Sequence, residues 1–147
     1  MYKLLIFCLF PLLFFPQKST KSIDSLINVT ERHFKKYEDV VVYANSKKII
    51  EWSEKLNYPK GKIYGNYYIS GVLYTISEHK KSLDLITKIK AEKKKGDYQS
   101  LYAKVYRNEA DNYFALGLYN LAVESNHKAL AQVKENNTEH NLLRSSI

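Results

Sequence analysis

Histidines are the side chains of this sequence best suited to bind a metal or to move a proton, and the four of them stand apart from one another: His33, His79, His127 and His140. None has a second histidine or a carboxylate four residues away, the spacing at which one helix face holds a zinc ion. We therefore expect them to be solvated or to cap helices. The five glycines are scattered, so no phosphate-binding loop is recognisable. We predict a protein without enzymatic activity, cofactor or metal.

The charge balance is basic, because 23 Lys and Arg face 15 Asp and Glu, for a net charge of +8. The lysines are scattered over predicted turns and helix faces. One dense run, Lys93–Lys95, precedes Gly96 at an expected helix end, where cations suit the helix dipole and glycine suits the C-cap. We predict no direct binding of nucleic acid by these residues.

The N-terminus reads as a targeting segment. Lys3 precedes an unbroken apolar stretch, Leu4 to Phe15, which ends at Pro16 and a polar run. A basic start, an apolar core of about 7–15 residues and a polar end are typical of a secretory signal. Residues 1–22 are thus predicted to be a signal peptide, or a membrane tether if uncleaved, because the best cleavage match (Thr20 to Ser22) is poor. A buried N-terminal helix is the alternative. The chain is expected to be exported, periplasmic or extracytoplasmic.

A pattern of residue types recurs at intervals of forty. When Ser70–Ile89 is laid over Ala110–Ala129, small residues pair with small ones and bulky residues with bulky ones. The small pairs are Ser70/Ala110, Ser77/Gly117 and Ser82/Ala122. The first and third pairs are expected to let the two helices of a hairpin approach closely. Another forty residues back, Thr30, Phe34, Val42 and Ile49 occupy the columns of Ser70, Tyr74, Ser82 and Ile89. A period of about 20–50 residues is typical of a solenoid built of stacked repeats.

Apolar stripes at a spacing of 3.6 residues predict an all-α protein. The expected helices cover residues 23–37, 40–57, 62–76, 79–92, 98–116 and 119–135, with a break from Asn57 to Gly61 around Pro59. They form three hairpins, 23–57, 62–92 and 98–135, within a repeat region of residues 23–137. Asp97 is expected to cap the fifth helix. Asn141, Leu142 and Leu143 fall in the columns of Leu101, Tyr102 and Ala103, so residues 138–147 are predicted to start a further helix of a truncated fourth hairpin.

The last repeat resembles the tetratricopeptide repeat (TPR) family, whose large, small, aromatic and turn-glycine positions have fixed spacings. The residues that carry the resemblance are Tyr106, Ala110, Tyr113, Gly117, Tyr119, Ala122 and Ala129. The resemblance is strong over residues 98–131 and weak before residue 60. The period is forty rather than thirty-four, as in long-helix variants, and the family proline is missing. Membership would imply an α-solenoid that binds other proteins.

The resemblance also implies a concave groove, lined by the first helix of each hairpin. In the middle repeat the groove positions are Tyr64, Tyr67, Tyr68, Gly71 and Tyr74, and in the last they are Lys104, Arg107, Asn108, Asp111 and Phe114. The first repeat, in a less certain register, offers Asp24, Ile27, Asn28, Glu31 and Phe34. Lys104, Arg107 and Asn108 are expected to hold a peptide carboxylate, partly neutralised by Asp111, and Gly71 to open space. The alternative is that the tyrosines pack between hairpins and the basic residues are solvated.

Two functions follow from this interpretation. The first is a non-enzymatic scaffold, exported or membrane-tethered, that binds a protein or peptide segment in its groove. The second is the N-terminal sensor part of a longer membrane-anchored regulator, which would continue into a helix-turn-helix or kinase module. For the scaffold, the uncapped C-terminal edge of the array is expected to offer a surface for self-association.

Overall fold

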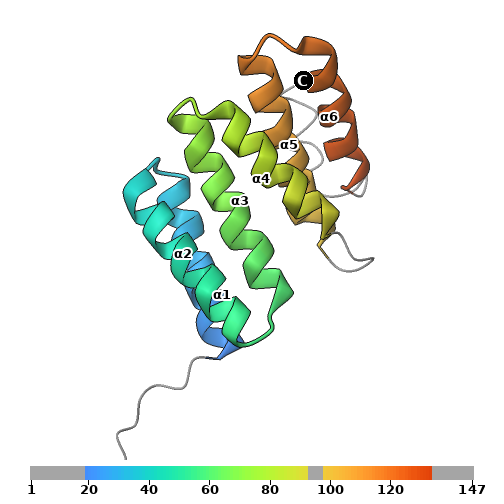
Figure 1. Ribbon diagram of the computed structural model, residues 1–147. Helices are drawn as coiled ribbons and strands as arrows, with labels where there is room; N and C mark the ends of the chain where they lie inside the picture. The colour runs from blue at the N-terminus through green and yellow to red at the C-terminus, as the bar shows by residue number, and fades with distance from the viewer. Residues whose placement is uncertain (1–18, 93–97, 134–147) are drawn as a thin grey trace, which may run out of the picture.

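The computed structural model describes residues 19–92 and 98–133, and these residues form six helices and no strand (Figure 1). The prediction of an all-α fold is therefore confirmed. The helices are α1 (Thr20–Phe34), α2 (Asp39–Lys55), α3 (Pro59–Thr75), α4 (His79–Ala91), α5 (Gln99–Ala115) and α6 (Tyr119–Ala131). Figure 1 shows them as three hairpins, α1–α2, α3–α4 and α5–α6, stacked side by side in chain order. None of the described helices is long and apolar enough to cross a bilayer.

The start of α3 differs from the sequence prediction. The helix begins at Pro59, whereas residues 57–61 were expected to form a break. Proline is well suited to the first helical position, because the amide hydrogen that it lacks has no partner there and its φ angle is already helical. Gly61 is then buried inside α3, where a Cβ would lie 2.1 Å from Ser53 Oγ, so the glycine permits close packing against α2.

The three hairpin turns have one backbone conformation, repeated every forty residues. Tyr37, Ser77 and Gly117 adopt left-handed φ angles of 58°, 62° and 74°, and the next helix begins two residues later in each hairpin. In each turn the following amide donates to a carbonyl five residues back: Glu38 to His33 at 3.2 Å, Glu78 to Leu73 at 2.8 Å and Leu118 to Tyr113 at 2.9 Å. This satisfies a carbonyl that the helix end would leave unpaired. The forty-residue period of the sequence is therefore also the interval at which the turn conformation of the backbone repeats.

Small side chains allow close packing within the hairpins, as the sequence pattern predicted. Ser70 and Ser82 are both fully buried, and Ser82 Oγ donates to the Ser70 carbonyl oxygen at 2.8 Å. Ala110 and Ala122, their counterparts in the last hairpin, are at most 4% exposed. Helix axes can approach closely only where such residues meet.

The core between the second and third hairpins is partly polar. Asn108, on α5, donates from Nδ2 to Ser70 Oγ at 2.7 Å. Glu109, 2% exposed, forms an ion pair with Lys90 of α4 and accepts a hydrogen bond from Ser125 Oγ of α6 at 3.0 Å. Buried polar groups are tolerated when each has a partner, and these partners come from different helices. The network therefore fixes how α5 sits on its neighbours.

Several sequence predictions lie outside the described residues. They are the apolar part of the predicted signal, the helix end at Lys93–Gly96, the cap at Asp97, and the further helix over residues 138–147. Thr20–Ser22, which were included in the predicted signal, form the first turn of α1. Ser19 caps this turn, because its Oγ accepts from the Ser22 amide at 3.3 Å.

Candidate functional site

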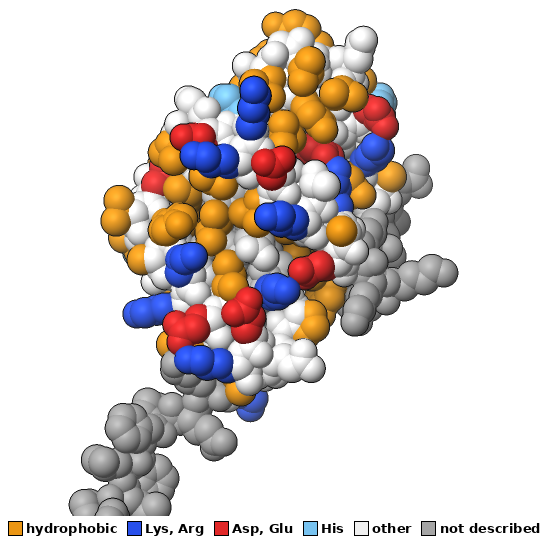
Figure 2. Space-filling view, in the orientation of Figure 1, with side chains coloured by type: hydrophobic (Ala, Val, Ile, Leu, Met, Phe, Trp, Pro, Cys, Tyr) orange, Lys and Arg blue, Asp and Glu red, His pale blue; other side chains and the backbone are white. Residues whose placement is uncertain are grey.

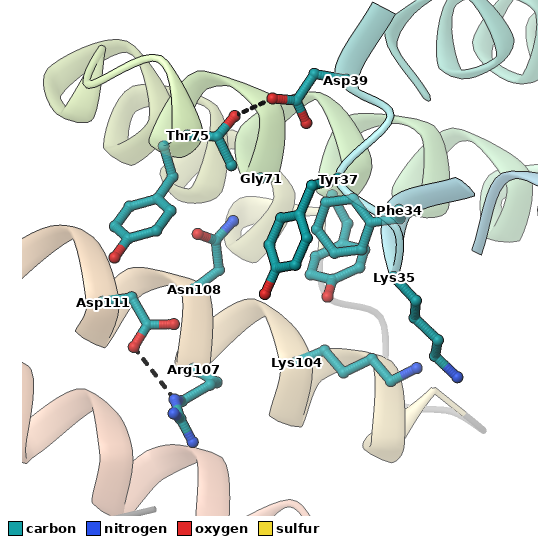
Figure 3. A pocket seen from close by; sticks show the side chains of 12 residues that line it. Phe34, Lys35, Tyr37, Asp39, Gly71, Thr75, Lys104, Arg107, Asn108 and Asp111 are labelled. Carbon is teal, nitrogen blue, oxygen red and sulfur yellow. Dashed lines mark hydrogen bonds and ion pairs between the residues drawn. The ribbon is translucent and has the colours of Figure 1, made fainter. Parts of the chain in front are cut away.

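A pocket of about 420 Å³ lies where the first helices of the three hairpins meet (Figure 3). Its walls come from the α1–α2 turn, from the second half of α3 and from the middle of α5. The lining residues are Phe34, Lys35, Tyr37, Asp39, Tyr67, Gly71, Tyr74, Thr75, Lys104, Arg107, Asn108 and Asp111. A volume in this range is typical of binding sites for small molecules or single side chains.

Six of the nine predicted groove residues line this pocket: Tyr67, Tyr74, Lys104, Arg107, Asn108 and Asp111. Gly71 and Phe34, expected at the same face, line it as well. These eight residues, from α1, α3 and α5, therefore lie together at one pocket, and their role as a binding groove stays a prediction.

Tyr68 is a correction, because it is a core residue rather than a groove residue. It is fully buried, and its hydroxyl donates to Glu31 Oε2 at 2.9 Å. Tyr64 is also absent from the pocket lining and packs on Tyr68, with 6.1 Å between ring centroids. Tyr68 lies on the side of α3 that packs against α1, whereas Tyr67 lines the pocket. The alternative interpretation, packing between hairpins, is the correct one for Tyr68.

Phe114 lies in a different place from the other predicted groove residues. It is 66% exposed and stacks edge to face on Tyr119, with 5.3 Å between centroids. The two rings line a separate, smaller hollow of about 340 Å³ between α5 and α6, which also includes Val123. The self-association predicted for this end of the array stays a prediction.

The residues predicted for the first repeat do not share one environment. Ile27 is buried in the core, and Asp24 accepts hydrogen bonds from the Tyr58 hydroxyl at 2.9 Å and from Lys60 Nζ at 3.1 Å. Glu31 lies beneath the pocket wall, where it meets charges described below. Of this group, Phe34 is the one that lines the pocket.

The cations of the pocket are already paired with carboxylates. Lys104 Nζ lies 3.2 Å from Glu31 Oε1, and Lys35 Nζ lies 3.8 Å from the same atom. Arg107 Nε lies 3.2 Å from Asp111 Oδ1, the pair drawn as a dashed line in Figure 3. The partial neutralisation by Asp111 expected from the sequence is confirmed, and the pairing with Glu31 extends it. Figure 2 shows the same mixture on a wider scale, with basic and acidic side chains interspersed over one face.

Asn108 is held by the core and does not present a free amide. Its side chain donates to Ser70, as described above, and its Oδ1 accepts a hydrogen bond from Asn112 Nδ2 at 3.1 Å. The residue is 8% exposed. Asn108 therefore orients α5 against α3, and the expected three-residue grip on a carboxylate by Lys104, Arg107 and Asn108 is not preformed.

Gly71 brings an aromatic ring into the pocket wall. A Cβ at this position would lie 2.5 Å from two ring carbons of Phe34, a distance that real Cβ atoms do not show. The glycine was expected to open space in the groove. Instead, the Phe34 ring takes up much of that space, and it contacts Tyr67 edge to face with 5.7 Å between centroids.

Four lining residues were missed by the sequence reasoning: Lys35, Tyr37, Asp39 and Thr75. Three of them belong to the α1–α2 turn, which the groove rule for first helices leaves out. Thr75 Oγ1 donates to Asp39 Oδ2 at 2.7 Å and joins this turn to the end of α3. A signal was available, because Tyr37 occupies the turn column of Ser77 and Gly117, where a large side chain is unexpected.

Burial holds the two neighbouring tyrosines in their neutral form. The pKa of Tyr67 and of Tyr68 is raised well above the ordinary value, chiefly by burial and then by the nearby Glu31 carboxylate. Both side chains therefore remain hydrogen-bond donors at any physiological pH. The Tyr68 hydroxyl uses this capacity on Glu31, whereas no described residue is a hydrogen-bond partner of the Tyr67 hydroxyl.

Each described histidine either contacts another side chain or faces solvent. His33 pairs with Glu38 at the α1–α2 turn, and His79 Nδ1 lies 3.2 Å from Asn112 Oδ1. His127 is exposed on α6, and His140 lies outside the described residues. Within residues 19–92 and 98–133, no cluster of His, Cys, Asp and Glu could hold a metal ion.

The fold and the pocket thus define an all-helical protein of three repeated hairpins with an aromatic pocket at their junction. In comparisons with known proteins, the chain matches no protein-family model, no curated protein and no solved structure. The resemblance to the tetratricopeptide family therefore rests on the pattern of residues in the sequence.

Proposed function

We propose that this chain is a solenoid of the tetratricopeptide type that binds a peptide segment of a partner protein and performs no chemistry of its own. The observation that carries the proposal is the pocket at the junction of α1, α3 and α5. A site assembled from three hairpins depends on the stacking of the whole array, and that is how solenoids create extended concave binding surfaces.

The composition of the pocket supports recognition of a side chain. Phe34, Tyr67 and Tyr74 supply aromatic surface, and rigid aromatic surface in a concave site contributes most of the binding free energy in many interfaces. Paired charges surround this surface at Lys104 and Arg107. Such a polar border orients a bound segment more than it strengthens the binding.

We also propose, on the basis of the N-terminal sequence, that the protein is exported or held at a membrane by residues 1–22. Fusion of these residues to a reporter enzyme that is active only outside the cytoplasm tests this. Reporter activity is the expected result, and a reporter that stays inactive would contradict export.

Selection of peptides from a random library displayed on phage tests the binding function. The selected peptides are then measured against a double variant, Lys104→Ala with Arg107→Ala, in which the charged border is removed. We expect affinity to fall by about two- to tenfold, the usual range for a few partly exposed polar contacts.

A matched control is the double variant Lys55→Ala with Lys128→Ala. These lysines also form ion pairs, with Glu51 at 2.6 Å and with Glu124 at 2.7 Å, but they lie outside the pocket. Affinity should not change in this control. If the library yields no binding peptide, or if both double variants bind like the unchanged chain, the groove does not have the proposed function.

A further inference from the structure

Three tyrosines line the pocket, and Tyr67 is the most buried of them. The residue is 8% exposed, and no described residue accepts from or donates to its hydroxyl. Among the described residues, Ser53 Oγ is the side-chain polar atom that is sealed from solvent and has no hydrogen-bond partner. The Tyr67 hydroxyl also has no partner but is not sealed in this way, so it is not enclosed in the core. Tyr67 belongs to the residues that line the pocket.

A comparison with Tyr68 shows what is unusual about Tyr67. The two residues are adjacent, and their rings pack together with 5.3 Å between centroids. The Tyr68 hydroxyl has a carboxylate partner at 2.9 Å. Buried hydroxyls are generally hydrogen-bonded, because burying one without a partner is costly. Tyr67 therefore has a hydrogen-bonding capacity that the rest of the protein leaves free for a molecule in the pocket.

The charges of the pocket argue against a charged ligand. Three cations, Lys35, Lys104 and Arg107, lie in the lining. Each is within ion-pair distance of a carboxylate, Glu31 or Asp111, while the remaining carboxylate, Asp39, accepts from the Thr75 hydroxyl. The three cations are thus balanced by the three carboxylates Glu31, Asp111 and Asp39, so the pocket favours neither an anion nor a cation.

The walls favour a flat ring. The Phe34 ring is pressed against Gly71, and the Tyr67 ring meets it edge to face. Figure 3 shows the rings of Phe34 and Tyr37 next to each other on one side of the cavity, with Arg107 and Asp111 on the other side. Aromatic side chains prefer offset or edge-to-face contacts with other rings, and such contacts add to the gain from burial.

We propose that this pocket is the subsite for one aromatic side chain with a polar tip, tyrosine or tryptophan, of the bound peptide. The proposal deepens the peptide-binding function and rests on it. The ring packs against Phe34 and Tyr74, and its hydroxyl or indole N–H exchanges a hydrogen bond with the Tyr67 hydroxyl. Phenylalanine fits the walls but leaves the Tyr67 hydroxyl without a partner, so it binds more weakly.

Titration of the ¹⁵N-labelled 147-residue chain with single blocked amino acids tests this inference by NMR. The probes are N-acetyl-tyrosinamide, N-acetyl-tryptophanamide, N-acetyl-phenylalaninamide and N-acetyl-leucinamide. We expect the amide signals of Gly71 and Thr75 to shift, and the tyrosine and tryptophan probes to bind about two- to tenfold more tightly than the phenylalanine probe. The leucine probe should bind most weakly.

The variant Tyr67→Phe isolates the hydroxyl. It keeps the ring and its packing, so the phenylalanine probe should bind as before, while the preference for tyrosine over phenylalanine should disappear. The matched control is Tyr68→Phe, which removes the adjacent hydroxyl from the core and should keep the preference. Both spectra must retain the dispersion of the folded chain.

The outcomes distinguish this inference from the function on which it rests. Equal binding of the tyrosine and phenylalanine probes, or a preference that survives Tyr67→Phe, overturns the role of Tyr67. Shifts confined to another surface, or no shift with any probe, overturn the aromatic subsite. In each of these cases the peptide-binding function still stands if the library selection yields peptides that depend on Lys104 and Arg107.

Discussion

Asn112 donates a hydrogen bond from Nδ2 to Ser82 Oγ over 3.0 Å, which links α5 of the third hairpin to α4 of the second. The same nitrogen donates to the carbonyl oxygen of Asn108 at 2.7 Å. Asn112 is fully buried, so neither bond competes with solvent. The Asn108 carbonyl belongs to α5 itself, so sliding α5 by one residue would keep that bond and break the bond to Ser82 of α4. The buried amide therefore selects one register for the third hairpin.

Replacement of Asn112 by valine should reduce the free energy of unfolding by about 1–3 kcal/mol, because buried polar partners lose their hydrogen bonds. Valine is the natural comparison, since Val72 occupies the same column one repeat earlier. Urea unfolding followed by circular dichroism at 222 nm measures the change. The exposed Asn120→Val is the control, and it should change stability by less than about 0.5 kcal/mol. Equal losses in the two variants would contradict the role assigned to Asn112.

Ser53→Ala should stabilise the protein, which is unusual for a core substitution. Ser53 Oγ is sealed from solvent and has no hydrogen-bond partner, so removal of the hydroxyl relieves a cost of about 1 kcal/mol or more. Thermal unfolding would show a higher Tm. Ser46→Ala is a matched control on the same helix, because Ser46 Oγ donates to the Val42 carbonyl oxygen at 2.6 Å. A Tm that falls in both variants would count against this prediction.

Gly71→Ala should destabilise the protein by about 1–3 kcal/mol, because the new methyl group overlaps the Phe34 ring. Adding Phe34→Leu should recover part of this loss, since leucine leaves room where the ring was. The four proteins form a double-mutant cycle, measured by urea unfolding. Simple additivity of the two substitutions would mean that Gly71 and Phe34 do not interact as described.

Stability should fall as the pH rises above about 10, the ordinary pKa of tyrosine. Burial raises the pKa of Tyr68 in the folded chain, so above pH 10 this hydroxyl loses its proton mainly in the unfolded chain, and unfolding is favoured. Below pH 10 the hydroxyl is protonated in both states and the full contribution is present.

The urea midpoint measured at pH 8, 9.5 and 10.5 tests this pH dependence. The unchanged chain should lose more stability over this interval than Tyr68→Phe, which has one fewer group to titrate. Tyr68→Phe should start from a lower midpoint at pH 8, because it lacks the hydrogen bond to Glu31. Parallel curves for the two proteins would exclude Tyr68 as the source.

Much of the fold could be predicted from the sequence because the repeat constrains the backbone at fixed intervals. Ser77 and Gly117 share a column, and both have the left-handed φ angles that a tight helix-to-helix turn requires. Ser82 was expected to bring two helices together, and its bond to the Ser70 carbonyl does so. A tight turn and a close contact between helices each require a certain kind of residue at one position, and such a requirement can be recognised in the sequence.

The candidate site was less predictable, because it depends on contacts between residues far apart in the chain. Lys104 and Arg107 were expected to be available to a ligand, but no spacing rule indicates that Glu31 would reach Lys104 from the first hairpin. Tyr67 lines the pocket whereas Tyr68 is buried in the core. This difference depends on the rotation of α3 about its own axis, which the forty-residue register does not specify. Tyr37 lines the pocket from a turn, whereas the groove positions taken from the tetratricopeptide family all lie on helices.

The ion pair between Lys104 and Glu31 has a consequence for how the array unfolds. In a stack where each hairpin contacts its neighbours alone, the end units can melt one at a time. Lys104 belongs to the third hairpin and Glu31 to the first, so this pair skips the middle one. Loss of either outer hairpin therefore removes a contact from the other. Such a link between non-adjacent units raises the cooperativity of the transition, and salt, which screens half-exposed charges, lowers it again.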